Sequence, residues 1–320
     1  MRFDDAITAY EAVLGIDPEN NEIKGKRNLA KKLRKEKLDK VHLARMTAVE
    51  KAEAEAKAKA EKAEAKLRGK AEASAKAKKV PRLIKAGSLE MEFAWIPPGT
   101  FFMGSPTEEE DRKSDETQHK VTLTKGFYMG VYTVTQEQWQ TLMGVNPSFF
   151  KGEKNLPVET VSWDDCQQFI KKLREKDKKP YRLPTEAEWE HACRAGTRTP
   201  FYFGKTISTG QANYDGDFAY ANGAKGLSRK KTTPVGSFPA NAWGLYDMHG
   251  NVWQWCQDRY GDYSKEDMTD PLGPDVGEYR ILRGGSWYGY PGYCRSAFRD
   301  AAKGMHGSSR CGFRLCFFLD

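Results

Sequence analysis

The chain of 320 residues has few cysteines and lacks any long apolar run. Six cysteines are too sparse for a fold held by disulfides, so we expect reduced thiols and a cytoplasmic location. No stretch approaches the roughly 18 apolar residues that a membrane-spanning helix needs. Charged residues from Arg2 to Glu11 also interrupt any N-terminal leader. We therefore expect no membrane span, whereas the 16 Phe, 14 Tyr and 8 Trp are enough for a substantial core.

The net charge of +8 comes from one segment that contains no aromatic residue and no proline. Residues 24–79 hold 20 Lys and Arg against 8 Asp and Glu, and the rest of the chain is close to neutral or acidic. Ala, Lys and Glu dominate the segment, and pairs such as Glu53 and Lys57 have the favourable i,i+4 order. We expect a helical spacer over 24–80 that binds no nucleic acid. Self-association through a weak coiled coil stays open, because the apolar stripe is broken.

The first 23 residues predict an amphipathic helix. Phe3, Ile7, Tyr10 and Leu14 recur at helical spacing, and Asp17-Pro18 stops the helix. The segment resembles the second helix of a tetratricopeptide repeat. Half a repeat cannot bury its own apolar face, so an ordinary helix that docks elsewhere is an equal alternative.

Residues 81–320 predict one α+β domain with much irregular backbone. Strands are expected within 89–102 and 120–134, interrupted at Pro97-Pro98-Gly99 and at Lys125-Gly126. Helices are expected over 135–142, 162–175 and 186–193, with N-caps at Thr135, Ser162 and Thr185. An internal ion pair is expected between Arg182 and Glu186.

Several long strings occur in a fixed order within this domain. They are Val134-Thr135-Gln136-Glu137-Gln138-Trp139, Arg182-Leu183-Pro184-Thr185-Glu186-Ala187-Glu188-Trp189-Glu190, Gly244-Leu245-Tyr246-Asp247-Met248 before Gly250-Asn251-Val252-Trp253, Leu282-Arg283-Gly284-Gly285-Ser286-Trp287, Cys294-Arg295-Ser296-Ala297 and Gly312-Phe313-Arg314. Together they resemble the formylglycine-generating enzyme family, also called the sulfatase-modifying factor family. The resemblance covers about three quarters of the chain and implies a C-type-lectin-like fold.

The resemblance also implies a chemistry that this chain has lost in part. The family's oxidases hold copper(I) between two thiolates, which are soft ligands suited to a soft cation. The matching positions here are Gly289 and Cys294. Copper is therefore not expected, because glycine offers no ligand, unless Cys311 or Cys316 supplies the second thiolate. The family's iron-dependent branch is not expected either, because the five histidines form no helical ligand pair.

A structural calcium ion is the more plausible cofactor that the resemblance implies. Calcium prefers carboxylate, amide and backbone oxygens. The positions that match the family's sites are Asn213 and Tyr214 in one site, and Asp247, Gly250, Val252 and Gln254 in the other. Glutamine replaces the usual glutamate at Gln254, which removes a negative charge.

The segment 288–311 has the Tyr, Gly and Ser composition of adaptable binding loops. We expect it to bind a protein or peptide ligand, without catalysis. Trp253 and Ser286 match the residues that line the family's substrate groove, and the remaining candidates are Trp287, Tyr288, Gly289, Tyr290, Tyr293, Phe298, Asp300, His306 and Ser309. The pattern also resembles the variable proteins of diversity-generating retroelements, which keep the flanking strings constant and vary the residues between them.

Two other functions stay open. One is a copper-dependent oxidase that converts a substrate cysteine to formylglycine, with Cys294 as a catalytic residue. The other is a scaffold in which the N-terminal helices do the binding.

Overall fold

The structure is a computed structural model that describes residues 3–40 and 82–318. The chain divides into two compact units, which we describe separately. In the first unit, helix α1 (Phe3–Ile16) ends just before Asp17-Pro18, as predicted, and residues 21–40 form a second helix. Ion pairs of Glu11 with Lys31 and of Asp4 with Arg34 join the two helices. The predicted spacer is helical over 24–40, and its remainder lies outside the described residues.

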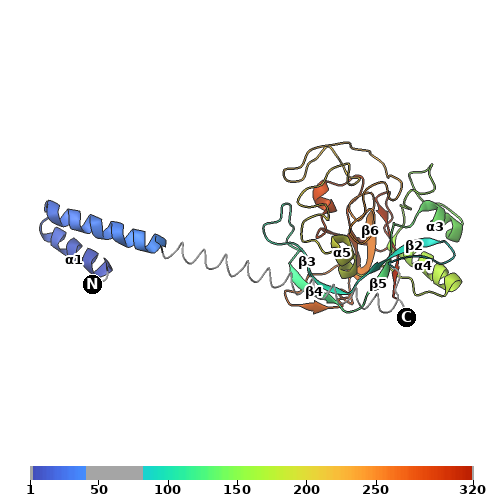
Figure 1. The fold of residues 1–320 in the computed structure, drawn as a ribbon, viewed down its shortest axis with the longest axis horizontal. Coiled ribbons are helices and arrows are strands. Elements are labelled where there is room, and N and C mark those ends of the chain that lie inside the picture. Colours follow the sequence, from blue (N-terminus) through green and yellow to red (C-terminus); the bar gives the residue numbers. More distant parts are fainter. Residues whose placement is uncertain (1–2, 41–81, 319–320) are drawn as a thin grey trace. The chain divides into compact units, whose positions relative to one another are not determined.

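Over residues 82–318, the second unit contains three small sheets and three α-helices (Figure 1). The first sheet has the order β1 (Leu83–Ala86), β2 (Met91–Ile96), β5 (Phe127–Gly130) and β11 (Cys316–Phe317), all antiparallel. The second has the order β10 (Cys311–Gly312), β6 (Trp253–Arg259), β8 (Tyr279–Arg283) and β9 (Arg299–Lys303). The third joins β3 (Gly99–Met103), β4 (His119–Leu123) and β7 (Met268–Thr269).

The three helices begin where the sequence predicts. α3 (Gln136–Met143), α4 (Trp163–Asp177) and α5 (Glu186–Arg194) each start after a capping box formed by Thr135, Ser162 and Thr185. The breaks at Pro97-Pro98 and Lys125-Gly126 separate β2 from β3 and β4 from β5, as expected.

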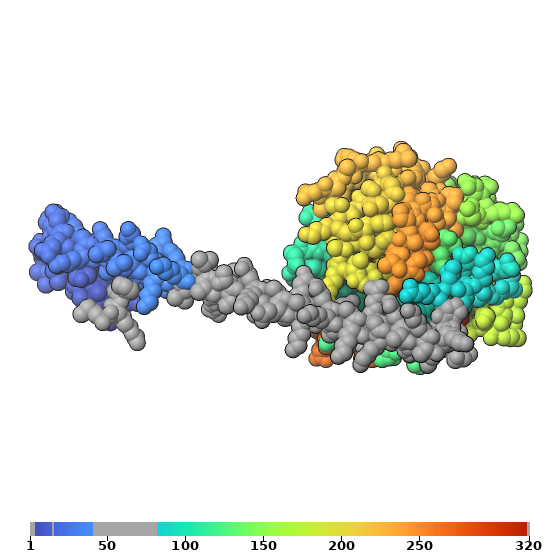
Figure 2. Space-filling view, viewed as in Figure 1, coloured from blue at the N-terminus to red at the C-terminus, as the bar shows by residue number. Residues whose placement is uncertain are grey.

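Irregular backbone makes up much of the domain. Residues 195–252 contain no named helix or strand, and this segment, yellow to orange in Figure 2, covers much of the face seen there. Among the described residues, no helix is long and apolar enough to cross a membrane. The mixed helix and sheet content with long irregular segments confirms the predicted fold class.

Helix α5 carries the charges that hold the second sheet. Glu186 accepts hydrogen bonds from Arg299 at 2.7 and 2.9 Å, and Arg283 is paired with both Glu186 and Glu190. Although burial alone would raise it, the charges of Arg299 and Arg283 hold the pKa of Glu186 below its ordinary value. The predicted pair of Arg182 with Glu186 is wrong. Arg182 instead binds Glu188, because successive glutamates of a helix point in different directions.

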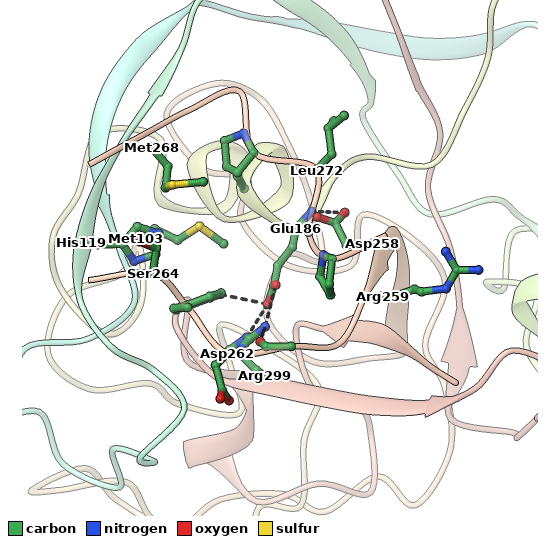
Figure 3. Close-up of a pocket in the computed structure, with 16 residues that line it drawn as sticks. Met103, His119, Glu186, Asp258, Arg259, Asp262, Ser264, Met268, Leu272 and Arg299 are labelled. Carbon is green, nitrogen blue, oxygen red and sulfur yellow. Dashed lines mark hydrogen bonds and ion pairs between the residues drawn. The ribbon is translucent and has the colours of Figure 1, made fainter. Parts of the chain in front are cut away.

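A cavity of about 300 Å³ lies beside this cluster and is lined in part by residues of the segment 261–274 (Figure 3). Asp258 lines it and accepts a hydrogen bond from the Glu186 backbone N–H at 2.8 Å. Burial, together with the neighbouring charge of Glu186, raises the pKa of Asp258 to about 8. The folded protein therefore holds the proton of Asp258 to a higher pH than the unfolded chain does.

Replacing Arg283 is expected to lower the free energy of unfolding of the domain more than a substitution at the surface does. Arg283→Met leaves Glu190 without one of its partners and removes donors to the carbonyls of Ser296, Ala297 and Phe298. Breaking a buried ion pair costs about 3–5 kcal/mol. We expect a loss of that size in the free energy of unfolding, measured in urea at pH 7. The exposed control Lys171→Met should stay within about 0.5 kcal/mol, and a loss below about 1 kcal/mol for Arg283→Met would contradict the assignment.

Asp258 is expected to make stability fall as pH rises. In the unfolded chain the carboxyl ionises near pH 4, whereas in the folded protein it stays protonated to about pH 8. The folded state therefore loses stability relative to the unfolded state between these two values. Asp258→Asn should gain stability over the wild type by at least about 1 kcal/mol on going from pH 5 to pH 8. Urea titrations at both values test this, and an advantage of constant size would exclude it.

Candidate functional site

The predicted binding segment, 288–311, includes most of the connection between β8 and β9, strand β9 itself and the turn that leads to β10. The connection between β8 and β9 is its first part. It begins at Gly284 and Gly285, whose φ values of 96° and 76° favour glycine, and passes through a short 3₁₀ helix, η1 (Pro291–Cys294). The buried Arg283 guanidinium donates hydrogen bonds to the backbone carbonyls of residues 296–298. The connection is thus a long loop on a rigid base.

Arg295 fixes this loop to a second segment of the domain. Its buried guanidinium binds Glu116 at 2.6 and 2.7 Å and Glu109 at 2.7 Å, and it donates to the Asp111 carbonyl at 2.8 Å. Although burial acts in the opposite direction, these carboxylates raise the pKa of Arg295, so its charge is permanent. Residues 109–116 and 290–295 are therefore held side by side.

Cys294 is a buried thiol rather than an exposed nucleophile. It has no exposed surface and packs in a small cluster with Phe201, Tyr214 and Tyr220. Burial raises the pKa of its thiol well above the ordinary value. Its carbonyl oxygen lies 2.7 Å from Nδ1 of His249, whose pKa burial lowers to about 3.

Position 289, which matches one of the two copper-binding cysteines of the family, offers no thiol to pair with Cys294. Cys311 and Cys316 belong to core clusters separate from that of Cys294. The Sγ atom of Cys193 lies 3.9 Å from Nδ1 of His249, the same ring nitrogen that contacts the Cys294 carbonyl oxygen. Burial raises the pKa of the Cys193 thiol to about 12. At position 289 a β-carbon would meet the Tyr293 ring at 3.5 Å and the Ser286 carbonyl at 3.6 Å, which are ordinary contacts. The backbone there accepts a side chain, but the chain supplies no thiol.

The remaining candidates of the binding segment divide by burial. Trp253 and Phe298 belong to the main core. Ser286 is fully buried, and its Oγ has no hydrogen-bond partner within the described ranges, 3–40 and 82–318. Tyr288 and Tyr290, by contrast, are 60% and 46% exposed. The groove residues that the family resemblance named, Trp253 and Ser286, are thus buried, whereas the tyrosines that follow Ser286 are exposed.

Two rows of aromatic rings lead from the surface to this loop. The first consists of Phe149, Phe150, Trp287 and Tyr288, with successive ring centroids 5.0–5.3 Å apart. The second consists of Phe218, Tyr290, Tyr293 and Phe298, with centroids 4.3–5.4 Å apart. Each row includes one exposed ring from a segment distant in sequence, Phe149 in the first row and Phe218 in the second, which are 72% and 42% exposed.

The sequence reasoning missed these outer rings. Their signal was a pair of adjacent phenylalanines after Asn146-Pro147-Ser148, and a phenylalanine that ends Asp215-Gly216-Asp217. It also missed Asp111 and Lys113, which line a cavity of about 310 Å³ together with the second row.

The last candidates lie in β9 and in the turn after it. Asp300, in β9, and His306, in the turn, are exposed residues, although partial desolvation of the carboxyl group raises the pKa of Asp300. The Ser309 carbonyl accepts a hydrogen bond from Nε1 of Trp287 at 3.0 Å. Ser309 therefore joins the first aromatic row through its backbone.

The candidate calcium ligands fit a cation only in part. Asn213 Oδ1 and Asp247 Oδ1 are buried and have no hydrogen-bond partner among the residues that the structure describes, and burial raises the pKa of Asp247 to about 6. The side-chain oxygen of Gln254, however, already accepts hydrogen bonds from Nε1 of Trp189 at 2.9 Å and from Nε of Arg314 at 2.7 Å. Asn213 and Asp247 keep an oxygen for a hard cation, whereas Gln254 does not.

The other candidate calcium ligands would act through their backbones. Tyr214 and Val252 are fully buried, and the Tyr214 hydroxyl donates to the Ile207 carbonyl at 3.2 Å. Gly250 has φ of 79° and pairs with Asn213, which brings the two candidate calcium sites next to each other.

Two known proteins have sequences similar to a large part of this chain. The chain is 31% identical over 261 residues to the serine/threonine-protein kinase pkn1 of Chlamydia caviae, and 36% identical over 174 residues to the formylglycine-generating enzyme of Streptomyces coelicolor. These matches cover 72% and 51% of this chain, but only 38% and 53% of the relatives. The chain thus spans about half or less of the length of these relatives.

Two solved structures match over most of the domain. Treponema denticola variable protein 1 is 29% identical with a TM-score of 0.66, over 75% of this chain and 99% of that one. PvdO from Pseudomonas aeruginosa is 30% identical with a TM-score of 0.65, over 74% of this chain and 98% of that one. Residues 81–317 match the family described as the sulfatase-modifying factor enzyme 1-like domain. The chain therefore belongs to the sulfatase-modifying factor family.

Proposed function

We propose that this domain is a non-catalytic module that binds a protein or peptide ligand through the 288–311 surface. The observation that carries the proposal is the pair of exposed tyrosines, Tyr288 and Tyr290, on a loop whose base is fixed by buried arginines. Tyrosine offers large contact area at a low cost in side-chain entropy, and a fixed backbone reduces the cost of ordering on binding.

The similarity to Treponema denticola variable protein 1 supports the same proposal. We propose that within 288–311 the residues between the constant strings vary, whereas Cys294-Arg295-Ser296-Ala297 and the strings on either side of the segment stay constant. The buried arginines of those strings would then preserve the fold, and the outward-facing side chains would change the ligand.

The alternative function is that of the formylglycine-generating enzymes among its relatives. The geometry of the thiols argues against it, since Cys294 is buried and position 289 carries no side chain. A structural role for calcium at Asn213 and Asp247 is compatible with either function, because both oxygens lie away from the loop surface in the buried interior.

A turnover assay separates the two functions. The full-length protein, copper(I) and air are incubated with a peptide that carries Cys-x-Pro-x-Arg, and mass spectrometry detects the aldehyde. We expect no conversion by the wild type, because position 289, which carries the second thiol in the family, is a glycine. We expect Gly289→Cys to bind copper(I) more tightly than the wild type in a competition with a chromogenic chelator, since position 289 accepts a side chain.

Tyr288→Cys is the matched control for that assay, because it places a thiol one residue away on the exposed surface. It should bind copper(I) no better than any exposed cysteine. Conversion of the peptide by the wild type would contradict the proposed non-catalytic function.

A further inference from the structure

The second aromatic row lines a cavity in the proposed binding surface. Phe218, Tyr290, Tyr293 and Phe298 contribute their rings to a cavity of about 310 Å³, and Asp111 and Lys113 contribute the charged groups. The four rings come from two segments that are more than 70 residues apart. Neighbouring rings lie at angles of 70°, 57° and 35°, so they form a concave wall rather than a flat stack.

The walls of this aromatic pocket are held in place from inside the domain. Arg295 donates to the carbonyl of Asp111, and Tyr220 donates to the carbonyl of Glu110 at 2.8 Å. The Gly289 carbonyl accepts a hydrogen bond from the Asp215 backbone at 2.9 Å, which ties the segment of Phe218 to the loop of Tyr290. The pocket is therefore preformed.

The charges around the aromatic pocket are unbalanced. Segments 107–113 and 215–218 carry six carboxylates against two cations, although residues 80–320 as a whole are nearly neutral. One of the six, Glu109, is paired with Arg295. Arg112 turns its Nε to the Ser105 carbonyl at 3.3 Å. The exposed charge next to the rings is thus mainly negative.

Aromatic faces and carboxylates attract the same kind of group. The face of an aromatic ring is negative and attracts a cation within about 6 Å of its centroid. A concave wall of such faces, rimmed by carboxylates, suits a positive group on a narrow stem. A neutral apolar group would gain nothing from the carboxylates.

We propose that the aromatic pocket takes the cationic end of a Lys or Arg side chain of the peptide or protein ligand. The inference rests on the proposed function and specifies the chemistry that the surface recognises. Lys113 is then an internal competitor, because its ammonium group carries the same charge as the ligand. Asp111 is the group that attracts the ligand.

Asp111 and Lys113 provide the sharpest test, because they have opposite charges and line the same cavity. Choline is titrated into the full-length protein at low salt, with 3,3-dimethylbutan-1-ol as the neutral molecule of the same shape, and binding is followed by NMR of the aromatic rings. We expect choline to bind at least about threefold more tightly than the alcohol. Asp111→Asn should weaken choline binding about two- to fivefold, and Lys113→Gln should strengthen it by a similar factor.

Asparagine suits position 111 because the backbone there has φ of 58°, which asparagine tolerates. Tyr290→Leu should abolish the preference for choline, since it keeps apolar bulk and removes a ring. Tyr288→Leu is the matched control, because Tyr288 does not line this cavity. Equal binding of choline and the alcohol, no binding of choline, tighter choline binding after Asp111→Asn or weaker choline binding after Lys113→Gln would each overturn the proposal.

Selection of random peptides on the full-length protein distinguishes this inference from the proposed function. Enriched peptides that contain Lys or Arg and lose binding on Tyr290→Leu, but not on Tyr288→Leu, support both. Enriched peptides that depend on Tyr290 without a basic residue overturn the cationic ligand and leave the binding surface intact. Peptides that bind independently of 288–311 overturn both.

Discussion

The fold of this domain depends on buried arginines that bind carboxylates and backbone carbonyls at the same time. Arg283 joins α5 to the backbone of 296–298, and Arg295 joins η1 to residues 109–116. Arg314 donates to the carbonyls of Gly130 and Tyr246 and to Gln254. A guanidinium has five donors in a fixed plane, so one side chain satisfies several buried acceptors of irregular backbone. This chemistry takes the place of the ladders that longer strands would provide.

Buried residues hold the loop and exposed residues form its surface, and this separation explains how a binding surface coexists with a stable fold. The arginines that hold the loop, Arg283 and Arg295, are buried. Tyr288, Tyr290 and His306, by contrast, are exposed. Changing the outward residues alters the surface but leaves the buried ion pairs intact. The covered Ser286 and Cys294 match the site at which relatives carry their chemistry, and here they are part of the interior.

Local sequence signals predicted the local structure well. The capping boxes at Thr135, Ser162 and Thr185 lie within four residues and therefore act without the rest of the fold. The partner of Arg182 was wrong, because spacing alone does not say which of two helix glutamates faces a distant arginine. The aromatic pocket could not be foreseen for the same reason. Phe218 and Asp111 reach Tyr290 only through tertiary contacts that no local pattern encodes.

The separation of scaffold and surface is the central claim, and it is tested most directly by removing the outward side chains together. A protein with Tyr288→Ser, Tyr290→Ser, Met305→Ser and His306→Ser is unfolded in urea beside the wild type, and the free energies of unfolding are compared. All four side chains are exposed. We predict one cooperative transition and a total loss below about 2 kcal/mol, as for independent surface substitutions. A loss above about 4 kcal/mol, or the disappearance of the cooperative transition, would show that the tyrosines hold the fold themselves.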